Sequence, residues 1–137
     1  MTETYEQDYY AWLTATAQAI EEGRFEEVDR ANLAEELRDM SRSEKRSIES
    51  FMERIMVHLL KIRYQPGRHT VSWDLSIGDS RVRLEKLFRE NPSLRAQAEE
   101  LMRDAYDSAR FGAAKQTKIA LDVFPEECPF SPEDVLG

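Results

Sequence analysis

Apolar residues recur at intervals of three and four residues through one stretch without Pro or Gly, from Asp29 to Gln65. The period of about 3.6 residues places such positions on one face of an α-helix. A second apolar line, made of Met52, Met56 and Leu60, widens that face in the latter half. The pattern predicts a long helix over about 29–65 whose second half is buried on more than one side. The first line consists of Leu33, Leu37, Met40, Ile48, Phe51, Ile55, Leu59 and Ile62.

Local signals mark both ends of this predicted helix and one candidate interruption. Asp29 is a favoured N-cap residue, and Pro66-Gly67 cannot continue a helix. Between these ends, Ser41 and Glu44 have the spacing of a capping box, and the apolar line lapses there. The stretch is therefore either one continuous helix with a solvated turn or two helices that meet near Ser41.

Similar periodicities and caps predict four further helices, over about 4–22, 71–90, 92–115 and 131–136. Three prolines, Pro125, Pro129 and Pro132, and several large apolar residues around them predict a rigid, extended strap that lies on the bundle and leads into the last helix. We therefore predict a single all-α domain over 1–137. It is a four-helix bundle-like array with a long second helix and a C-terminal extended strap ending in a short helix.

The predicted length of the second helix indicates a partner. A helix of about 36 residues is about 54 Å long. A compact domain of 137 residues has a diameter of only roughly 37 Å. An unbroken helix must therefore extend beyond a compact monomer or contact another chain. We expect a homo-oligomer, most simply a dimer, or a complex with another protein.

Charge is unevenly distributed along the chain. Residues 1–37 carry ten acidic and two basic side chains, whereas residues 38–68 carry eight basic and four acidic ones. The net charge of −8 opposes general nucleic-acid binding, which needs a positive field. The basic stretch either forms a local patch or is partly neutralised by the acidic first helix. The patch would consist of Arg38, Arg42, Lys45 and Arg46.

The composition also indicates in which cellular compartment the protein is expected. No apolar run approaches the ~20 residues of a membrane span, and the N-terminus lacks a signal-peptide pattern. The single Cys128 excludes an internal disulfide and a cysteine-based zinc cluster. We expect a cytoplasmic protein with no membrane segment.

Two histidines are the main candidates for chemistry. His58 lies among apolar residues of the long helix, with Arg54 one turn before it, and it is either a structural histidine or a base in a cleft. His69 follows Arg63 with a spacing found in some helical nucleases, but Pro66-Gly67 interrupts the helix between them. No Glu lies three residues before either histidine, so a di-iron carboxylate site is not supported, and we expect no metal or cofactor.

Several segments together carry a resemblance that covers nearly the whole chain. The sequence resembles the bacterial proteins grouped as domain-of-unknown-function family twenty-nine, although Phe130 stands where a Tyr is usual and Ile62-Arg63 replace a bulky aromatic residue before Tyr64. The matching segments are Asp8-Tyr9-Tyr10-Ala11-Trp12, Asn32-Leu33-Ala34-Glu35-Glu36-Leu37, Met40, Ser43-Glu44, His58-Leu59-Leu60-Lys61, Tyr64-Gln65-Pro66, Ser72-Trp73, Asn91-Pro92-Ser93-Leu94 and Phe124-Pro125-Glu126-Glu127-Cys128-Pro129-Phe130.

This resemblance implies an all-helical fold and no particular activity. It also implies that His58, Tyr64 and Trp73 are family features, so we treat Tyr64 and Trp73 as candidate binding residues. Trp12 joins them as a core or interface anchor of the first helix.

Three hypotheses for function follow from the sequence. No segment assembles a nucleophile, a base and an oxyanion site, so we expect a non-enzymatic interaction protein that associates with itself. The first alternative is a metal-independent nuclease that uses His58 or His69 with a nearby Arg. The second is a nucleic-acid-associated regulator acting through the Arg38–Arg46 patch.

Overall fold

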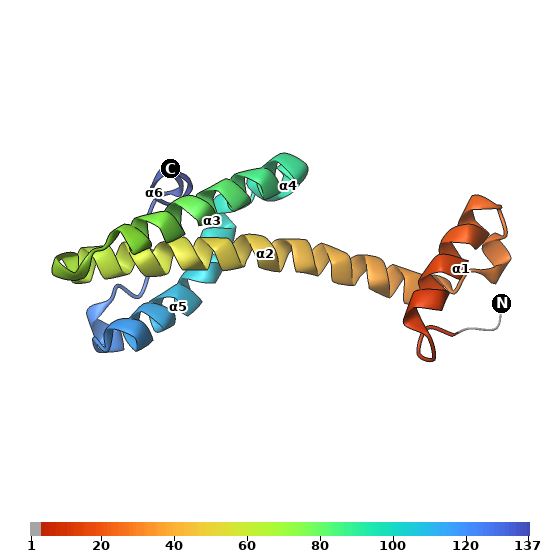
Figure 1. Cartoon of the computed structure of the whole chain (residues 1–137), viewed down its shortest axis with the longest axis horizontal. Coiled ribbons are helices and arrows are strands. Elements are labelled where there is room, and N and C mark those ends of the chain that lie inside the picture. Colours follow the sequence, from red (N-terminus) through yellow and green to blue (C-terminus); the bar gives the residue numbers. More distant parts are fainter. Residues whose placement is uncertain (1–3) are drawn as a thin grey trace. The chain divides into compact units, whose positions relative to one another are not determined.

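The structure, a computed structural model, describes residues 4–137 and is all-α (Figure 1). Among these residues there are six α-helices and no strand, as the sequence predicts. The four-helix bundle-like arrangement stays a prediction. The helices are α1 (Tyr9–Glu21), α2 (Arg30–Tyr64), α3 (Val71–Glu90), α4 (Pro92–Arg95), α5 (Ala98–Thr117) and α6 (Pro132–Leu136), with short 3-10 turns at Phe25–Glu27, Pro66–Arg68 and Leu121–Val123.

The chain divides into two compact units, one up to Ser43 and one from Glu44 to Gly137. Each unit is described by itself below, and the predicted single-domain organisation stays a prediction. Helix α2 is continuous from Arg30 to Tyr64, so the alternative with a break near Ser41 is wrong. Serine is tolerated inside a helix when its side chain is solvated, and Ser41 and Ser43 are both exposed.

The first unit contains α1 and the beginning of α2. Helix α1 begins at Tyr9 rather than at the expected Thr4, because the Asp8 side chain accepts a hydrogen bond from the amide of Ala11 at 3.0 Å and caps the helix. Residues 5–7 form a turn instead. Three residues of α1 are buried, namely Trp12, Thr16 and Ala19.

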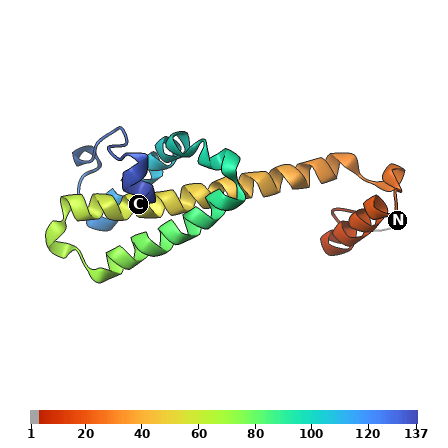
Figure 2. The same cartoon turned by 90° about the horizontal axis from the view of Figure 1, so that it is seen from above.

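The second unit contains the main hydrophobic core. Helices α3 and α5 run alongside the second half of α2 (Figures 1 and 2), and their facing side chains fill the space between them. Helix α2 contributes the predicted wide face to this core. Its buried residues are Ile48, Met52, Ile55, Met56, Val57 and Leu60.

The expected helix over 92–115 is in fact two helices. The amide of Gln97 bonds to the carbonyl of Leu94 at 3.0 Å, three residues back, and Gln97 has φ −101° and ψ 13°. This tighter turn ends α4 and lets α5 start in a new direction at Ala98. Local periodicity did not reveal the change, because the apolar spacing continues through the junction.

The C-terminal strap lies on the second unit, as its apolar residues predict, and ends in α6. The guanidinium of Arg110 donates to the carbonyls of Leu121 and Phe124, at 3.1 and 3.2 Å, and Phe124 is buried. Arg81 on α3 donates to the carbonyls of Asp134 and Val135 in α6. These charge-assisted bonds hold an otherwise irregular segment against the helices.

Candidate functional site

The His58 cleft lies between α2 and α5 in the second unit and is the strongest candidate for chemistry. It has a volume of about 310 Å³ and is lined by Ser50, Phe51, Glu53, Arg54, Val57, His58, Gly112 and Gln116. The predicted pair of His58 and Arg54 is therefore brought together in one cleft. Gly112 permits the close approach of the two helices, since a Cβ there would lie 3.3 Å from a methyl carbon of Val57.

The imidazole of His58 is held in one tautomer. Its Nδ1 lies 2.8 Å from the backbone carbonyl of Arg54, and because a carbonyl only accepts, Nδ1 carries the proton. Burial lowers the pKa of His58 below its ordinary value, and nearby Lys61 and Arg54 act in the same direction, against the hydrogen bond to the Arg54 carbonyl. The ring is therefore neutral near pH 7, with Nε2 as a hydrogen-bond acceptor. Both the structural and the functional interpretation of His58 remain predictions.

The second predicted pair, Arg63 and His69, lies in different surroundings. Nε2 of His69 is 2.6 Å from the carboxylate of Asp74, and its ring stacks on Trp73. Arg63 instead lies over the ring of Phe130, with 5.0 Å between its guanidinium carbon and the ring centre. Each residue already has its own contacts, so the geometry does not support a joint site.

The aromatic candidates fall into two groups. Trp12 is 1% exposed and packs at 4.9 Å from the Tyr5 ring, so it is a core residue of the first unit. Tyr64 packs edge-on against Phe124 of the strap. Trp73 is half-buried, and the Lys61 ammonium lies 4.6 Å above its ring. None of the three forms a stacking platform together with another.

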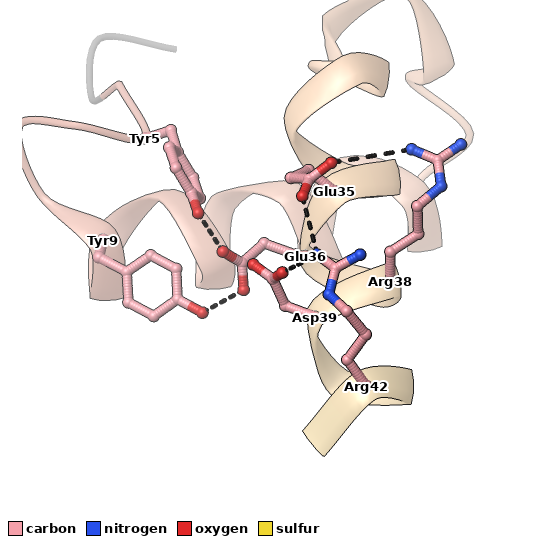
Figure 3. Close-up of polar contacts among 7 residues, drawn as sticks. All are labelled: Tyr5, Tyr9, Glu35, Glu36, Arg38, Asp39 and Arg42. Atoms are coloured by element: carbon pink, nitrogen blue, oxygen red, sulfur yellow. Dashed lines mark hydrogen bonds and ion pairs between the residues drawn. The ribbon is translucent and has the colours of Figure 1, made fainter. Parts of the chain in front are cut away.

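In the first unit, polar contacts connect α1 to α2 (Figure 3). The phenol groups of Tyr5 and Tyr9 both donate hydrogen bonds to the carboxylate of Glu36, one to each oxygen. The bond to Glu36, with burial and its negative charge, raises the pKa of Tyr5 to about 12. The pKa of Tyr9 is raised by the same causes. The Tyr9–Glu36 bond fixes which side of α2 faces α1.

The predicted basic residues follow one another along α2 and are all exposed. Arg42 pairs with Asp39 and, at 3.0 Å, with Glu35 (Figure 3). Arg38 approaches Glu35 only at 3.9 Å. Carboxylates of the same helix, rather than the first helix, therefore offset part of the charge at Arg38 and Arg42. Lys45 and Arg46 belong to the second unit, and the joint patch stays a prediction.

Exposed apolar side chains form the candidate interaction surfaces. Leu37 and Met40 belong to the predicted apolar line of α2, yet they are 58% and 63% exposed. Helix α3 exposes Val71, Leu75 and Val82 on the side opposite its buried residues. Sequence reasoning missed this second row. The spacing could have predicted this row, because Val71, Leu75 and Val82 are four and seven residues apart. Gly78 lies between Leu75 and Val82 at the same helical spacing and continues the row without a polar side chain.

Clusters of metal-ligating side chains and membrane-spanning helices were both sought in the described part of the chain. Among residues 4–137, no group of three or more His, Cys, Asp or Glu side chains could hold a metal ion. None of the helices described there combines the length and the apolar character that crossing a bilayer requires.

Fold and surfaces together define an all-α protein with a packed second unit and exposed apolar rows. The chain belongs to the family described as Domain of unknown function DUF29, whose model matches residues 4–137. The resemblance seen in the sequence is thereby confirmed. No curated protein and no solved structure matches the chain.

Proposed function

We propose that the protein is a non-enzymatic protein–protein interaction module that associates with itself. One observation carries this proposal, namely that α2 has no buried residue before Ile48 although it presents Leu37 and Met40 there. Burying one such side chain contributes about 1.5–3 kcal/mol. A face that leaves this contribution unused is typical of an interaction surface when several apolar residues share it.

The length of α2 supports the same proposal. A helix stretch of this kind is marginal in water unless an apolar face packs against a neighbour. We place the protein in the cytoplasm, since its one cysteine, Cys128, is a half-buried thiol with a pKa raised by burial. An unpaired thiol of this kind is typical of a reducing compartment. Copies of the chain would then associate through non-covalent contacts rather than through a disulfide.

Light scattering behind a sizing column tests self-association directly. At tens of micromolar we expect a mass of at least two chains, falling toward the 16.0 kDa of one chain on dilution. A mass of one chain at every concentration would remove self-association from the proposal. Association that requires a different protein would appear as a monomer alone and a complex with the captured partner.

The His58 cleft supports a second candidate function, metal-independent cleavage of a phosphodiester. The specific observation is a neutral imidazole in a cavity that Arg54 also lines, although the Arg54 guanidinium lies 3.8 Å from the carboxylate of Asp79 on α3. A neutral histidine can take a proton from an attacking hydroxyl, and an arginine can stabilise charge on phosphate. The joint use of Arg63 and His69 lacks such support.

Cleavage of RNA and DNA by the unchanged protein and by two variants separates these functions. His58→Ala should abolish cleavage if the cleft is catalytic, whereas His69→Ala should leave it unchanged. Chelator in every reaction excludes a contaminating metal-dependent nuclease. Equal rates for the unchanged protein and His58→Ala would leave only the interaction function.

A further inference from the structure

Two polar side chains of the His58 cleft are each oriented by one hydrogen bond. On α2, Nδ1 of His58 donates to the carbonyl of Arg54, which leaves Nε2 of the ring as an acceptor. On α5, Oε1 of Gln116 accepts a hydrogen bond from the Lys61 ammonium at 3.1 Å. Because an ammonium only donates, this bond identifies the amide oxygen and leaves the amide nitrogen of Gln116 as a donor.

The two remaining groups form a complementary pair in one cleft. Both side chains line it, and within residues 4–137 neither Nε2 of His58 nor Nε2 of Gln116 makes a hydrogen bond. The cleft therefore offers one acceptor from α2 and one donor from α5. The orientation of each is set before a ligand arrives, and such preorganisation lowers the cost of binding.

The charges around the cleft balance and favour a neutral ligand. Glu53 and Arg54 are the ionised residues of its lining and have opposite signs. Outside the lining, the carboxylate of Asp79 lies 3.8 Å from the Arg54 guanidinium, and the Lys61 ammonium bonds to Gln116. Two positive and two negative side chains thus surround the cleft, so a ligand with a net charge gains little from it.

The apolar part of the lining favours a small ring. Phe51 supplies an aromatic side chain, and Val57 supplies aliphatic surface. Gly112 has no side chain to occupy the space between the helices, where a Cβ would lie 3.3 Å from a methyl carbon of Val57. The volume of about 310 Å³ is near the lower end of the range of about 300–1,000 Å³ for small-molecule sites.

A nucleobase combines these properties in one group. It is planar, and one edge presents a donor beside an acceptor, as N6 and N7 of adenine do. Unpaired bases are bound through such edges while they stack on aromatic side chains. A peptide group does not match, because the N–H and C=O of a trans peptide point in opposite directions.

We propose that the His58 cleft binds a single unpaired nucleobase. Nε2 of His58 accepts a hydrogen bond from the base, the Gln116 amide donates one to it, and Phe51 is the aromatic surface on which it stacks. The base belongs either to a free nucleotide or to a single strand, and these contacts are the same in both. This inference goes beyond both proposed functions, because it requires neither self-association nor cleavage.

Titration of the isotope-labelled full chain with the common ribonucleoside monophosphates tests the site. We expect the NMR signals of the Gly112 amide and the Gln116 side-chain amide to shift saturably with at least one of them, with a Kd of about 1 mM or less. Ribose phosphate lacks the base, and propionamide has a donor beside an acceptor but no ring. We expect each to bind at least about tenfold more weakly than that nucleotide.

Two conservative variants test the polar pair. His58→Asn retains a donor for the Arg54 carbonyl and lacks the Nε2 acceptor. Gln116→Glu retains an oxygen for Lys61 and lacks the amide donor. We expect each to weaken nucleotide binding at least about tenfold. Gln97→Glu is the matched control, because it makes the same change of charge at an exposed residue outside the cleft, and we expect it to change the Kd less than about twofold.

The outcomes separate this inference from the proposed functions. Binding of no nucleotide, or equally tight binding of ribose phosphate or propionamide, overturns it and leaves self-association standing. Equal affinities in the unchanged protein and both cleft variants also overturn it. Helical circular dichroism that equals that of the unchanged protein shows that weaker binding is not unfolding. The monophosphates contain no phosphodiester, so a chain that cleaves nothing still binds them if the inference holds.

A short single-stranded DNA distinguishes the two sources of the base. Binding tighter than that of the monophosphate with the same base supports a strand as the ligand. Equal or weaker binding supports a free nucleotide. Binding of the strand that is unchanged by His58→Asn and Gln116→Glu, with no binding of any monophosphate, places the contact elsewhere and overturns the inference.

Discussion

The two halves of helix α2 have similar apolar spacing and opposite surroundings. In the first half, Leu37 and Met40 repeat at the helical period and remain exposed. In the second half, Met52, Met56 and Leu60 repeat at the same period and are fully buried, because α3, α5 and the strap supply neighbours. Periodicity therefore predicts which face is apolar, whereas the number of packed neighbours decides whether that face is covered within the chain.

The two units also differ in the interactions that stabilise them. The second unit has a core contributed by all its longer helices and by Phe124 and Phe130 of the strap. The first unit depends on three buried residues and on hydrogen bonds to Glu36. We therefore expect substitutions in the second unit to affect folding, and substitutions on the exposed rows of the first to affect association.

Truncation of a buried leucine should give the largest effect. Leu60→Ala leaves a cavity in the second unit, and we expect it to lower the free energy of unfolding by about 2–5 kcal/mol. Leu37→Ala, the same substitution on the exposed half of α2, should change it by less than about 0.5 kcal/mol. Urea unfolding at submicromolar concentration, where association is minimal, measures both. Equal losses would show that Leu37 is covered within one chain.

Hydrogen exchange should show the same gradient along one helix. At submicromolar concentration, we expect the amides of residues 33–43 to exchange at least about tenfold faster than those of residues 48–60. Association through the exposed Leu37 and Met40 should slow the first set at higher concentration and leave the second unchanged. Uniform protection along α2 at the lowest concentration would contradict the comparison.

A matched pair of tyrosines sharpens the comparison further. The phenol of buried Tyr106 donates to the carbonyl of Pro125 at 2.7 Å, so Tyr106→Phe should reduce stability by about 1 kcal/mol. Tyr5→Phe removes a bond to Glu36 in the first unit and should have a smaller effect. Unfolding of the two variants at neutral pH measures the difference. If Tyr5→Phe lowered the unfolding free energy more than Tyr106→Phe, the polar contacts of the first unit would contribute more to stability than its small core suggests.

The same tyrosines predict a pH dependence at the alkaline side. Burial raises the pKa of Tyr106 to about 12, above its ordinary value of about 10. The stabilisation linked to this shift is therefore complete below about pH 10 and is lost as the pH rises through about 12. In an alkaline titration followed by phenolate absorbance, the unchanged protein should show a tyrosine that ionises at unusually high pH. Tyr106→Phe should lack this group. An unchanged titration curve would contradict the assignment.

The smallest expected effect concerns His58. Because burial lowers its pKa, the folded chain binds fewer protons than the unfolded chain below about pH 6.5. The stability linked to His58 is present above that pH and declines as the pH falls through the lowered folded pKa. His58→Gln should reduce this decline, measured as unfolding free energy at pH 7.5 and at pH 5.5. A steeper decline in the variant would contradict the lowered pKa.

Much of the fold could be predicted because helix ends are set by neighbouring residues. Pro66, Asn91 and the Ser131-Pro132 pair mark the ends of elements locally, and the structure has helices where these signals place them. The division at Gln97 could not be predicted, because its three-residue hydrogen bond leaves the apolar spacing unchanged. For the candidate sites, the spacing of Arg54 and His58 predicted one shared face. The contribution of Gly112 and Gln116 from α5 to the same cleft required the packed structure.

The sequence by itself determined the all-α class, the helical stretch over about 29–65 and the family, since these depend on local periodicity, caps and segment matches, whereas the structure showed that this stretch is continuous through Ser41. Only the tertiary structure decided that Leu37, Met40, Leu75 and Val82 are uncovered, that Trp12 is buried, and that His69 pairs with Asp74 rather than with Arg63. Burial and pairing depend on residues distant in the chain. A residue's own position along a helix determines the direction of its side chain, and other elements determine what that side chain meets.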